Sequence, residues 1–177
     1  CKSIDIIPMT PDGKPTPALL TKASLDIAKI PHFVINAGSK IHPDVSYFDS
    51  QLDYGKNISE STALTPEKVI EAVEFGRVIG KSISKPNDCL VIGESIPGGT
   101  TTALAVLKGF GIDTSVSSSM PNNPIEIKNQ TVSSALKRLT SDDPINIISE
   151  LGDPMIPVIA GILSESSKIT HVILAGG

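Results

Sequence analysis

The sequence has no tryptophan, and aromatic residues make up only 3% of its 177 residues. Proteins that bind single-stranded nucleic acids stack the bases on aromatic side chains, so this shortage argues against such a surface. Basic residues are also in the minority, because 15 lysines and arginines stand against 19 aspartates and glutamates and give a formal net charge of −4. A non-specific nucleic-acid surface needs clustered positive charge, so we expect no nucleic-acid partner.

Cysteine and long apolar runs are scarce as well. The two cysteines, Cys1 and Cys89, are too few for a structural zinc site. Cys89 lies in the apolar run that ends at Ile92, so we expect a buried, reduced thiol and a cytoplasmic protein. No apolar run reaches the ~18 residues that a membrane-spanning helix requires, so we expect no membrane partner. The start of the chain also lacks the apolar stretch of a signal peptide.

The sequence does contain enough apolar material for one core. Hydrophobic residues make up 40% and charged residues 19% of the chain, a composition typical of a folded globular protein rather than a disordered one. We expect a single α/β domain over residues 1–177. Because the chain begins at Cys1 without a methionine and its last predicted strand runs into a glycine turn at Gly176, we expect this domain to be the core of a longer parent protein.

Helical and strand-like segments alternate along the chain. Apolar periodicity and capping residues predict helices over 18–30, from 65 to 83, over 100–108, over 125–139, a short one from 143 and a longer one from 153 through 163. Short apolar runs predict strands over 32–38, 89–92, 114–116 and 171–174. These strands are continuously apolar, as in a parallel sheet covered on both faces. The order predicts a doubly wound, mostly parallel sheet with helices on both faces, which is a Rossmann-like, three-layer α/β fold.

Two details of this prediction concern side chains. In the helix over 125–139 we expect Ile127, Val132, Ala135 and Leu136 to face the core. Residues 39–64 form a long polar loop, and loops of that length are often functional. The loop contains His42, but the spacing of its histidine and aspartates matches no metal motif, so we expect no metal site and no cofactor.

Ligands of open parallel sheets bind beyond the carboxyl ends of the strands. The residues at those ends are small and polar here, which leaves room for a ligand and offers backbone N–H groups. They are Asn36-Ala37-Gly38, Gly93-Glu94-Ser95, Ser117-Ser118-Ser119 and Ala175-Gly176-Gly177. Asn36 and Ser118 are therefore candidate contacts to a substrate.

The turn after the strand over 89–92 is the strongest local motif. Gly98 and Gly99 follow the strand, and three threonines then open a helix. Glycines let backbone N–H groups approach an anion, the helix dipole favours negative charge, and hydroxyls add donors. Gly98, Gly99, Thr100 and Thr101 are therefore a candidate phosphate cradle. The turn is neither a Walker A loop nor a dinucleotide fingerprint, and the alternative is a tight strand-to-helix turn with threonine caps.

Three charged residues have both a functional and a structural interpretation. Glu94, in the same turn, can accept a proton, hold a ribose hydroxyl or stabilise positive charge on a substrate; the structural alternative is that it points into solvent or accepts backbone hydrogen bonds across the turn. Lys128, near the start of a predicted helix, either neutralises a phosphate or is a solvated surface lysine. Asp153 is explained by capping of the helix that starts at Pro154.

The segment from Gly93 to Ala103 resembles the signature turn of the nicotinate-nucleotide–dimethylbenzimidazole phosphoribosyltransferases, most closely in their archaeal branch. Three further segments are similar to family motifs and stand in the family's order: the helix led by Lys128, residues 152–163 and the strand end at 172–176. The resemblance covers about residues 88–177, with weaker support from 34–38.

The resemblance implies an enzyme that moves phosphoribose from nicotinate mononucleotide to a benzimidazole-type base in the assembly of the cobalamin lower ligand. It also implies a homodimer and a principal catalytic glutamate beyond residue 177. Glu94 would then lie near the ribose or the base. The residues that would bind the phosphate are Gly98, Gly99, Thr100, Thr101, Lys128 and Gly176.

This sequence departs from the family pattern in places, which leaves other functions open. Gly99 stands where the family has an asparagine, and Ala175 stands where it has an aspartate, so the identity of the accepting base is undetermined. A small-molecule kinase is one alternative, although no Mg²⁺-binding aspartate pair is visible. A non-catalytic mononucleotide-binding or regulatory domain is another, and a scaffold that only dimerises through apolar helices is a third.

Overall fold

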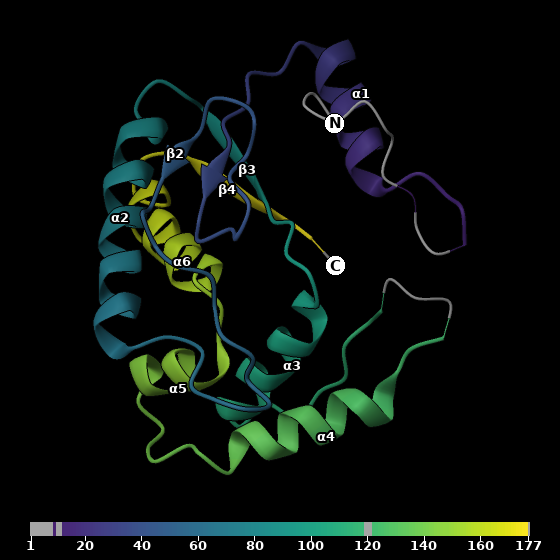
Figure 1. Ribbon diagram of the computed structural model, residues 1–177. Coiled ribbons are helices and arrows are strands. Elements are labelled where there is room, and N and C mark those ends of the chain that lie inside the picture. Colours follow the sequence, from purple (N-terminus) through teal and green to yellow (C-terminus); the bar gives the residue numbers. More distant parts are fainter. Residues whose placement is uncertain (1–8, 10–11, 119–121, 177) are drawn as a thin grey trace.

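The structure is a computed structural model that describes residue 9, residues 12–118 and residues 122–176. These residues form an α/β fold with six helices and two small parallel sheets (Figure 1). The elements in chain order are α1 Pro17–Ala28, β1 Ile35–Asn36, β2 Phe48–Asp49, α2 Pro66–Ser84, β3 Cys89–Gly93, α3 Gly99–Gly109, α4 Ile125–Leu136, α5 Pro144–Leu151, α6 Met155–Ser166 and β4 His171–Ala175.

The helices begin where the sequence predicts them to begin. The Thr65 hydroxyl accepts a hydrogen bond from the Lys68 N–H at 3.4 Å, and Pro66 takes the first position of α2. Asp143 caps α5 in the same way, because its carboxylate accepts from the N–H groups of Ile145 and Asn146. Caps of this kind satisfy N–H groups that have no partner within the helix, so they fix where each helix starts.

Both sheets are parallel, as the sequence predicts, and each has two strands. β3 pairs with β4 in register from Cys89 opposite His171 to Gly93 opposite Ala175. β1 pairs with β2. The sequence did not predict the strand β2, because its residues lie inside the segment that was expected to be a polar loop. The predicted strand over 114–116 is wrong, since the structure has no strand there; Val116 instead packs against the core and accepts a hydrogen bond from Asn123.

The sheet formed by β3 and β4 is covered by helices on one face. Ile92 packs against the cluster that α2 and α6 form, whereas Val91 is 66% exposed on the opposite face. Cys89 lies on the exposed face with Val91, so the prediction of a buried thiol is wrong. The apolar run predicted burial on both faces, but among the described residues no element covers the second one.

α2 and α6 pack with almost no space between their backbones. A Cβ atom added at Gly76 would lie 2.1 Å from the carbonyl oxygen of Val158, and one added at Gly161 would lie 2.1 Å from that of Val73. Gly80 also faces the backbone of α6, at Ile162. The glycines therefore set the distance between the two helices. Residues 152–154, which lead directly into α6, are held in place with it.

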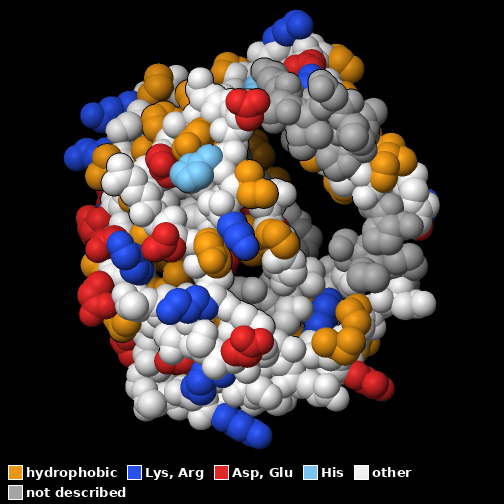
Figure 2. All heavy atoms as spheres, viewed as in Figure 1, with side chains coloured by type: hydrophobic (Ala, Val, Ile, Leu, Met, Phe, Trp, Pro, Cys, Tyr) orange, Lys and Arg blue, Asp and Glu red, His pale blue; other side chains and the backbone are white. Residues whose placement is uncertain are grey.

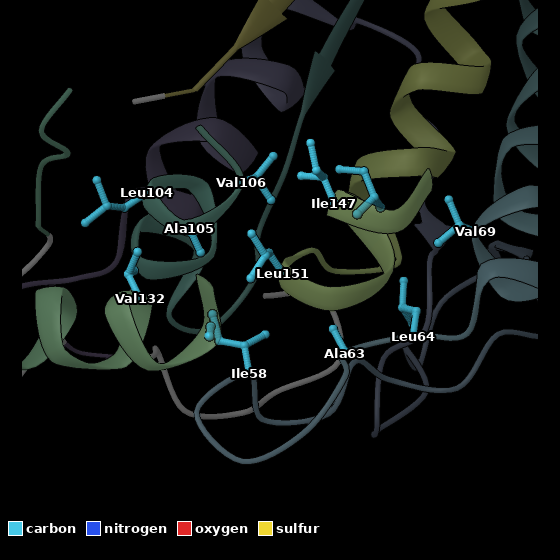
Figure 3. Packing of buried hydrophobic residues seen from close by; sticks show 12 residues of the cluster. Ile58, Ala63, Leu64, Val69, Leu104, Ala105, Val106, Val132, Ile147 and Leu151 are labelled. Carbon is cyan, nitrogen blue, oxygen red and sulfur yellow. The ribbon is translucent and has the colours of Figure 1, made fainter. Parts of the chain in front are cut away.

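A second core lies where α3, α4 and α5 meet the loop that leads into α2 (Figure 3). It buries Val132 and Ala135 of α4 as predicted, but Ile127 is 67% exposed, so its predicted inward position is wrong. The buried residues of α4 are Lys128, Val132 and Ala135, which share one face of the helix, and Ile127 lies outside that face. The other members of this core are Ile58, Ala63, Leu64, Val69, Leu104, Ala105, Val106, Ile147, Ile148 and Leu151.

α1 stands apart from both cores. It buries no residue, and Figure 2 shows an opening between the body of the molecule and the region on the right where α1 lies. Its apolar side chains Leu20 and Ile27 are exposed, together with Ile30 just beyond it. In the part of the chain that the structure describes, no helix is both long and apolar enough to cross a membrane.

Arg138 connects the loop over 56–64 to α5. Its guanidinium donates hydrogen bonds to the carbonyl oxygens of Ile58 and Ser61 and pairs with Glu150 at 3.3 Å. The Thr62 hydroxyl donates to the same carboxylate. Because these groups are mostly buried, the interactions are little weakened by water.

We expect the variant Arg138→Met to lower the free energy of unfolding by about 2–3 kcal/mol, because two carbonyl oxygens and one carboxylate lose a charged donor. Urea denaturation followed by circular dichroism measures this loss. Arg77→Met is the matched control, because the Arg77 side chain is 47% exposed where it pairs with Glu74 and Glu165, and ion pairs of an exposed guanidinium contribute little. Equal losses in the two variants would contradict the anchoring role of Arg138.

Candidate functional site

The carboxyl ends of β3 and β4 lie side by side. Gly93 is paired with Ala175, so Glu94 and Gly176 follow neighbouring strands at the same edge of the sheet. An added Cβ at Gly176 would have no atom within 4 Å, which means that the backbone beyond β4 is open to a ligand. Ligands of parallel α/β sheets bind at this edge, so it is the candidate site.

The glycine turn ends at the start of α3. Gly98 has a φ of +68°, a conformation that suits glycine, and it is the N-cap of the helix. No side chain caps this end, so the alternative of threonine caps is wrong. The N–H groups of Thr101 and Thr102 bond to the Gly98 carbonyl, whereas those of Gly99 and Thr100 have no partner among the described residues. Two backbone donors are therefore available to an anion.

Glu94 closes the same turn. Its Oε2 atom accepts a hydrogen bond from the Ile96 N–H at 3.1 Å, as one of the two interpretations of the sequence predicts. The same oxygen lies 4.0 Å from the Cβ position of Gly99. The carboxylate is exposed, and Oε1 forms no hydrogen bond within the described chain. Glu94 thus supports the turn with one oxygen and leaves the other for a substrate.

Lys128 is a buried cation. Its side chain lies in α4 and only 6% of the residue is exposed, so the interpretation as a solvated surface lysine is wrong. The Nζ atom donates a hydrogen bond to the carbonyl oxygen of Ser117 at 2.7 Å. No carboxylate of the described residues pairs with it. A buried ammonium group has three donors and needs acceptors for all of them, so this one is incompletely satisfied within the described structure.

α3 and α4 bring Lys128 towards the glycine turn. Val132 of α4 and Ala105 of α3 lie in the same core cluster and face each other in Figure 3. Lys128 is one helical turn before Val132, and Thr101 is one turn before Ala105. α3 and α4 run in the same general direction in Figure 1. The first turns of both helices, which carry Thr101 and Lys128, therefore lie on the same side of the contact between Ala105 and Val132.

Asn36 shapes the turn after β1. It is 2% exposed, and its Oδ1 atom accepts hydrogen bonds from the N–H groups of Gly38 and Ser39. Its Nδ2 atom donates to Asp49 at 3.1 Å. These bonds occupy the side chain, which gives Asn36 a structural role in the turn after β1. Ser118, the other candidate, is half-buried at the end of a described segment, and Ser119 and Gly177 lie outside the described residues.

Asp153 is the residue whose surroundings the sequence did not predict. Its Oδ1 atom accepts a hydrogen bond from the Met155 N–H at 2.9 Å, so the predicted capping contact is present. The carboxyl group is also half-buried against Gly55 of the long loop and lies within electrostatic reach of Glu94. The sequence offers one hint of these surroundings: Asp153 follows a glycine at a predicted helix start. That position is typical of any helix cap, so the hint does not single out Asp153.

The sequence matches known proteins over most of its length. A family model described as phosphoribosyltransferase matches residues 25–177. A UPF0284 protein of Archaeoglobus fulgidus is 51% identical over 177 residues, which make up 100% of this chain and 52% of that protein. A UPF0284 protein of Saccharolobus solfataricus is 46% identical over 180 residues, an alignment that covers 100% of this chain and 50% of that protein. The chain therefore spans about half the length of the curated relatives it matches.

Two solved structures from Thermus thermophilus share the fold. A nicotinate-nucleotide-dimethylbenzimidazole phosphoribosyltransferase superposes with a TM-score of 0.70 at 23% identity, covering 87% of this chain and 48% of that one. A structure named CobT superposes with a TM-score of 0.68 at 24% identity, covering 88% and 50%. This likeness confirms the predicted Rossmann-like α/β class.

Proposed function

We propose, because this chain belongs to the phosphoribosyltransferase family, that its longer protein transfers phosphoribose from nicotinate mononucleotide to a benzimidazole-type base. One of the structures with the same fold is named for a nicotinate nucleotide and dimethylbenzimidazole, which supports this pair of reactants. The product is a riboside phosphate of the base, and its expected use is as the lower-ligand nucleotide of cobalamin. The reaction makes the enzyme a pentosyltransferase.

The observation that carries the proposal is the buried ammonium group of Lys128. Placing a positive charge out of water costs free energy unless an anion or several acceptors surround it. Within the described structure it has one acceptor, the Ser117 carbonyl. A phosphate would supply both the missing negative charge and the missing acceptors. A substrate that carries a phosphate therefore fits this position better than a neutral one.

The start of α3 supplies the remaining phosphate contacts in this proposal. Among the described residues the N–H groups of Gly99 and Thr100 have no partner, and the hydroxyls of Thr100 and Thr101 add donors that form no capping bond there. The helix dipole favours negative charge at the same place. Gly98 leaves open space beside these donors, since an added Cβ there would contact nothing within 4 Å.

The sheet edge supplies the part of the site where the ribose is expected. Positive charge develops at C1′ as nicotinate leaves, and a nearby carboxylate stabilises it. Glu94 has one oxygen free within the described chain, and the open backbone at Gly176 follows the neighbouring strand. We therefore assign Glu94 to the ribose or the incoming base and Gly176 to the phosphoribose.

Calorimetric titration with nicotinate mononucleotide tests this function, with nicotinic acid and ribose 5-phosphate as controls. We expect the mononucleotide to bind at least tenfold more tightly than nicotinic acid, a difference of ~1.4 kcal/mol, because only the mononucleotide carries a phosphate. Ribose 5-phosphate should compete for the same site. Equal affinities for the mononucleotide and nicotinic acid would contradict phosphate recognition. Binding without any turnover by the longer protein would instead favour a regulatory domain.

The proposal includes a homodimer in the cytoplasm. The apolar side chains of Leu20, Ile27 and Ile30 on and beside α1 are exposed, and a second copy of the protein is one surface that covers them.

A further inference from the structure

The turns after β1 and β3 meet at the start of α6. Ile35 of β1 and Ile92 of β3 both pack against the cluster that α2 and α6 form, so the two strands share one layer. Beyond β1, a Cβ added at Gly38 would lie 3.1 Å from the side chain of Pro154. Beyond β3, Glu94 lies within electrostatic reach of the aspartate that precedes this proline. The turn after β1 therefore borders the sheet edge where the ribose is expected.

The long loop brings an aromatic ring to the same edge. Leu52 is buried in the α2–α6 cluster and anchors the loop. The carbonyl oxygen of the next residue would lie 2.7 Å from a Cβ added at Gly38, and a Cβ added at Gly55 would lie 3.5 Å from Oδ2 of Asp153. Tyr54 lies between these two contacts and is 52% exposed. Its backbone is thus held on both sides while its ring stays open to a ligand.

Lys40 places a positive charge over this ring. Its Nζ atom lies 5.6 Å from the centroid of the Tyr54 ring. The turn that carries Lys40 is fixed, because Oδ1 of Asn36 accepts hydrogen bonds from the N–H groups of Gly38 and Ser39. Among the residues that the structure describes, no carboxylate forms an ion pair with Lys40. An exposed ring beside an ammonium group suits a flat ligand that carries negative charge.

Two flat ring systems take part in the proposed reaction, and their charges differ. Nicotinate carries a carboxylate, which supplies acceptors for an ammonium group, whereas the benzimidazole-type base is neutral. The face of a pyridine ring also stacks on a tyrosine. The pair formed by Lys40 and Tyr54 therefore matches the nicotinate part of the substrate better than it matches the incoming base.

The order of the contacts agrees with the order of the groups in nicotinate mononucleotide. The phosphate is expected at Lys128 and the start of α3. Glu94 comes next, because its Oε2 atom lies 4.0 Å from the Cβ position of Gly99 on one side and its charge reaches Asp153 on the other. Tyr54 follows, since the residue after it faces Asp153. Phosphate, ribose and ring thus meet successive parts of the site.

We propose that Tyr54 and Lys40 bind the nicotinate group of nicotinate mononucleotide, with its ring stacked on Tyr54 and its carboxylate accepting a hydrogen bond from Nζ of Lys40. This inference rests on the proposed function. It makes Lys40 a specificity-determining residue, because nicotinamide mononucleotide carries a neutral amide where nicotinate mononucleotide carries the carboxylate. The site then selects the acid form of the substrate over the amide.

Calorimetric titration of the longer protein with the two mononucleotides tests the role of Lys40. The wild-type protein should bind nicotinate mononucleotide about tenfold more tightly than nicotinamide mononucleotide, because only the former offers a charged acceptor. In Lys40→Met this preference should disappear through weaker binding of nicotinate mononucleotide alone. Lys85→Met is the matched control, because Lys85 is an exposed lysine at the end of α2 and precedes β3, at the opposite edge of the sheet. A Lys40→Met protein with the preference of the wild-type protein would overturn the proposal.

The variant Tyr54→Leu tests the stacking contact. We expect its affinity for both mononucleotides to fall roughly tenfold, because stacking on an aromatic side chain is lost. Its affinity for ribose 5-phosphate, which has no ring to stack, should stay that of the wild-type protein. Tyr54→Phe keeps the ring face and should bind like the wild-type protein. An unchanged affinity in Tyr54→Leu, or an equal loss for ribose 5-phosphate, would contradict the stacking role.

Transfer activity distinguishes failure of this inference from failure of the proposed function. If the wild-type longer protein transfers phosphoribose from nicotinate mononucleotide and Lys40→Met keeps its preference for that substrate, only the assignment of Lys40 and Tyr54 is wrong. If the wild-type protein neither binds nicotinate mononucleotide nor transfers its phosphoribose, the proposed function is wrong and this inference fails with it.

Discussion

The variant Gly76→Ala is expected to lose at least about 4 kcal/mol of the roughly 5–15 kcal/mol that stabilises a typical domain. The new Cβ would lie 2.1 Å from the carbonyl oxygen of Val158 and 3.0 Å from the backbone nitrogen of Ile162. Both atoms belong to the backbone of α6, so no side-chain rotation relieves the clash. The helices must separate, and this opens the core that Ala72, Ile79 and Ile162 share.

Chemical denaturation followed by circular dichroism measures the effect, and hydrogen exchange in α2 and α6 locates it. Val78→Ala is the control, because Val78 lies on the exposed side of the same helix and its replacement changes only local helix propensity. The variant Gly161→Ala should reproduce the loss from the opposite helix, since its Cβ would meet the Val73 carbonyl at the same 2.1 Å. A Gly76→Ala protein as stable as Val78→Ala would show that the helices are not in this contact.

The variant Lys128→Met is expected to weaken the binding of nicotinate mononucleotide by roughly 100-fold, which corresponds to ~2.7 kcal/mol. Methionine keeps most of the volume of the buried lysine stem but removes the charge and the donors that a phosphate requires. Stability should change little in the absence of ligand, because a buried charge with one acceptor is replaced by an apolar group.

Calorimetry with the mononucleotide checks this expectation, and thermal unfolding of the free variant confirms that it is folded. Lys137→Met is the control, because Lys137 is the exposed C-cap of the same helix and lies away from the glycine turn. The affinity for ribose 5-phosphate should fall in parallel with that for the mononucleotide. If Lys128→Met binds the mononucleotide as tightly as Lys137→Met, the phosphate does not lie at Lys128 and the assignment of the cradle is wrong.

Features that depend on neighbours in the sequence were predictable from it. The starts of α2 and α5 follow from Thr65-Pro66 and Asp143-Pro144, because a cap acts on N–H groups two or three residues away. The glycine turn before α3 was also evident, since its residues are contiguous. The parallel pairing of β3 with β4 followed from the alternation of strands and helices.

Features that depend on distant residues were not predictable. β2 forms because the Phe48 N–H donates to the Val34 carbonyl, and nothing near Phe48 indicates that partner. The burial of Lys128 depends on the segment at Ser117 and on α3, and periodicity alone gives a lysine no such position. The environment of Asp153 depends on Gly55 and Glu94, which lie far from it in the chain.

The close contact between α2 and α6 has a consequence for the order in which the protein folds. α2 ends at Ser84 and α6 begins at Met155, so a long stretch of chain must be drawn together before Gly76 meets Val158. Closing such a loop costs entropy that is recovered only when the helices dock, and proteins rich in distant contacts fold slowly. During synthesis α2 emerges well before its partner, so the apolar stripe of α2 stays exposed to chaperones until α6 has left the ribosome.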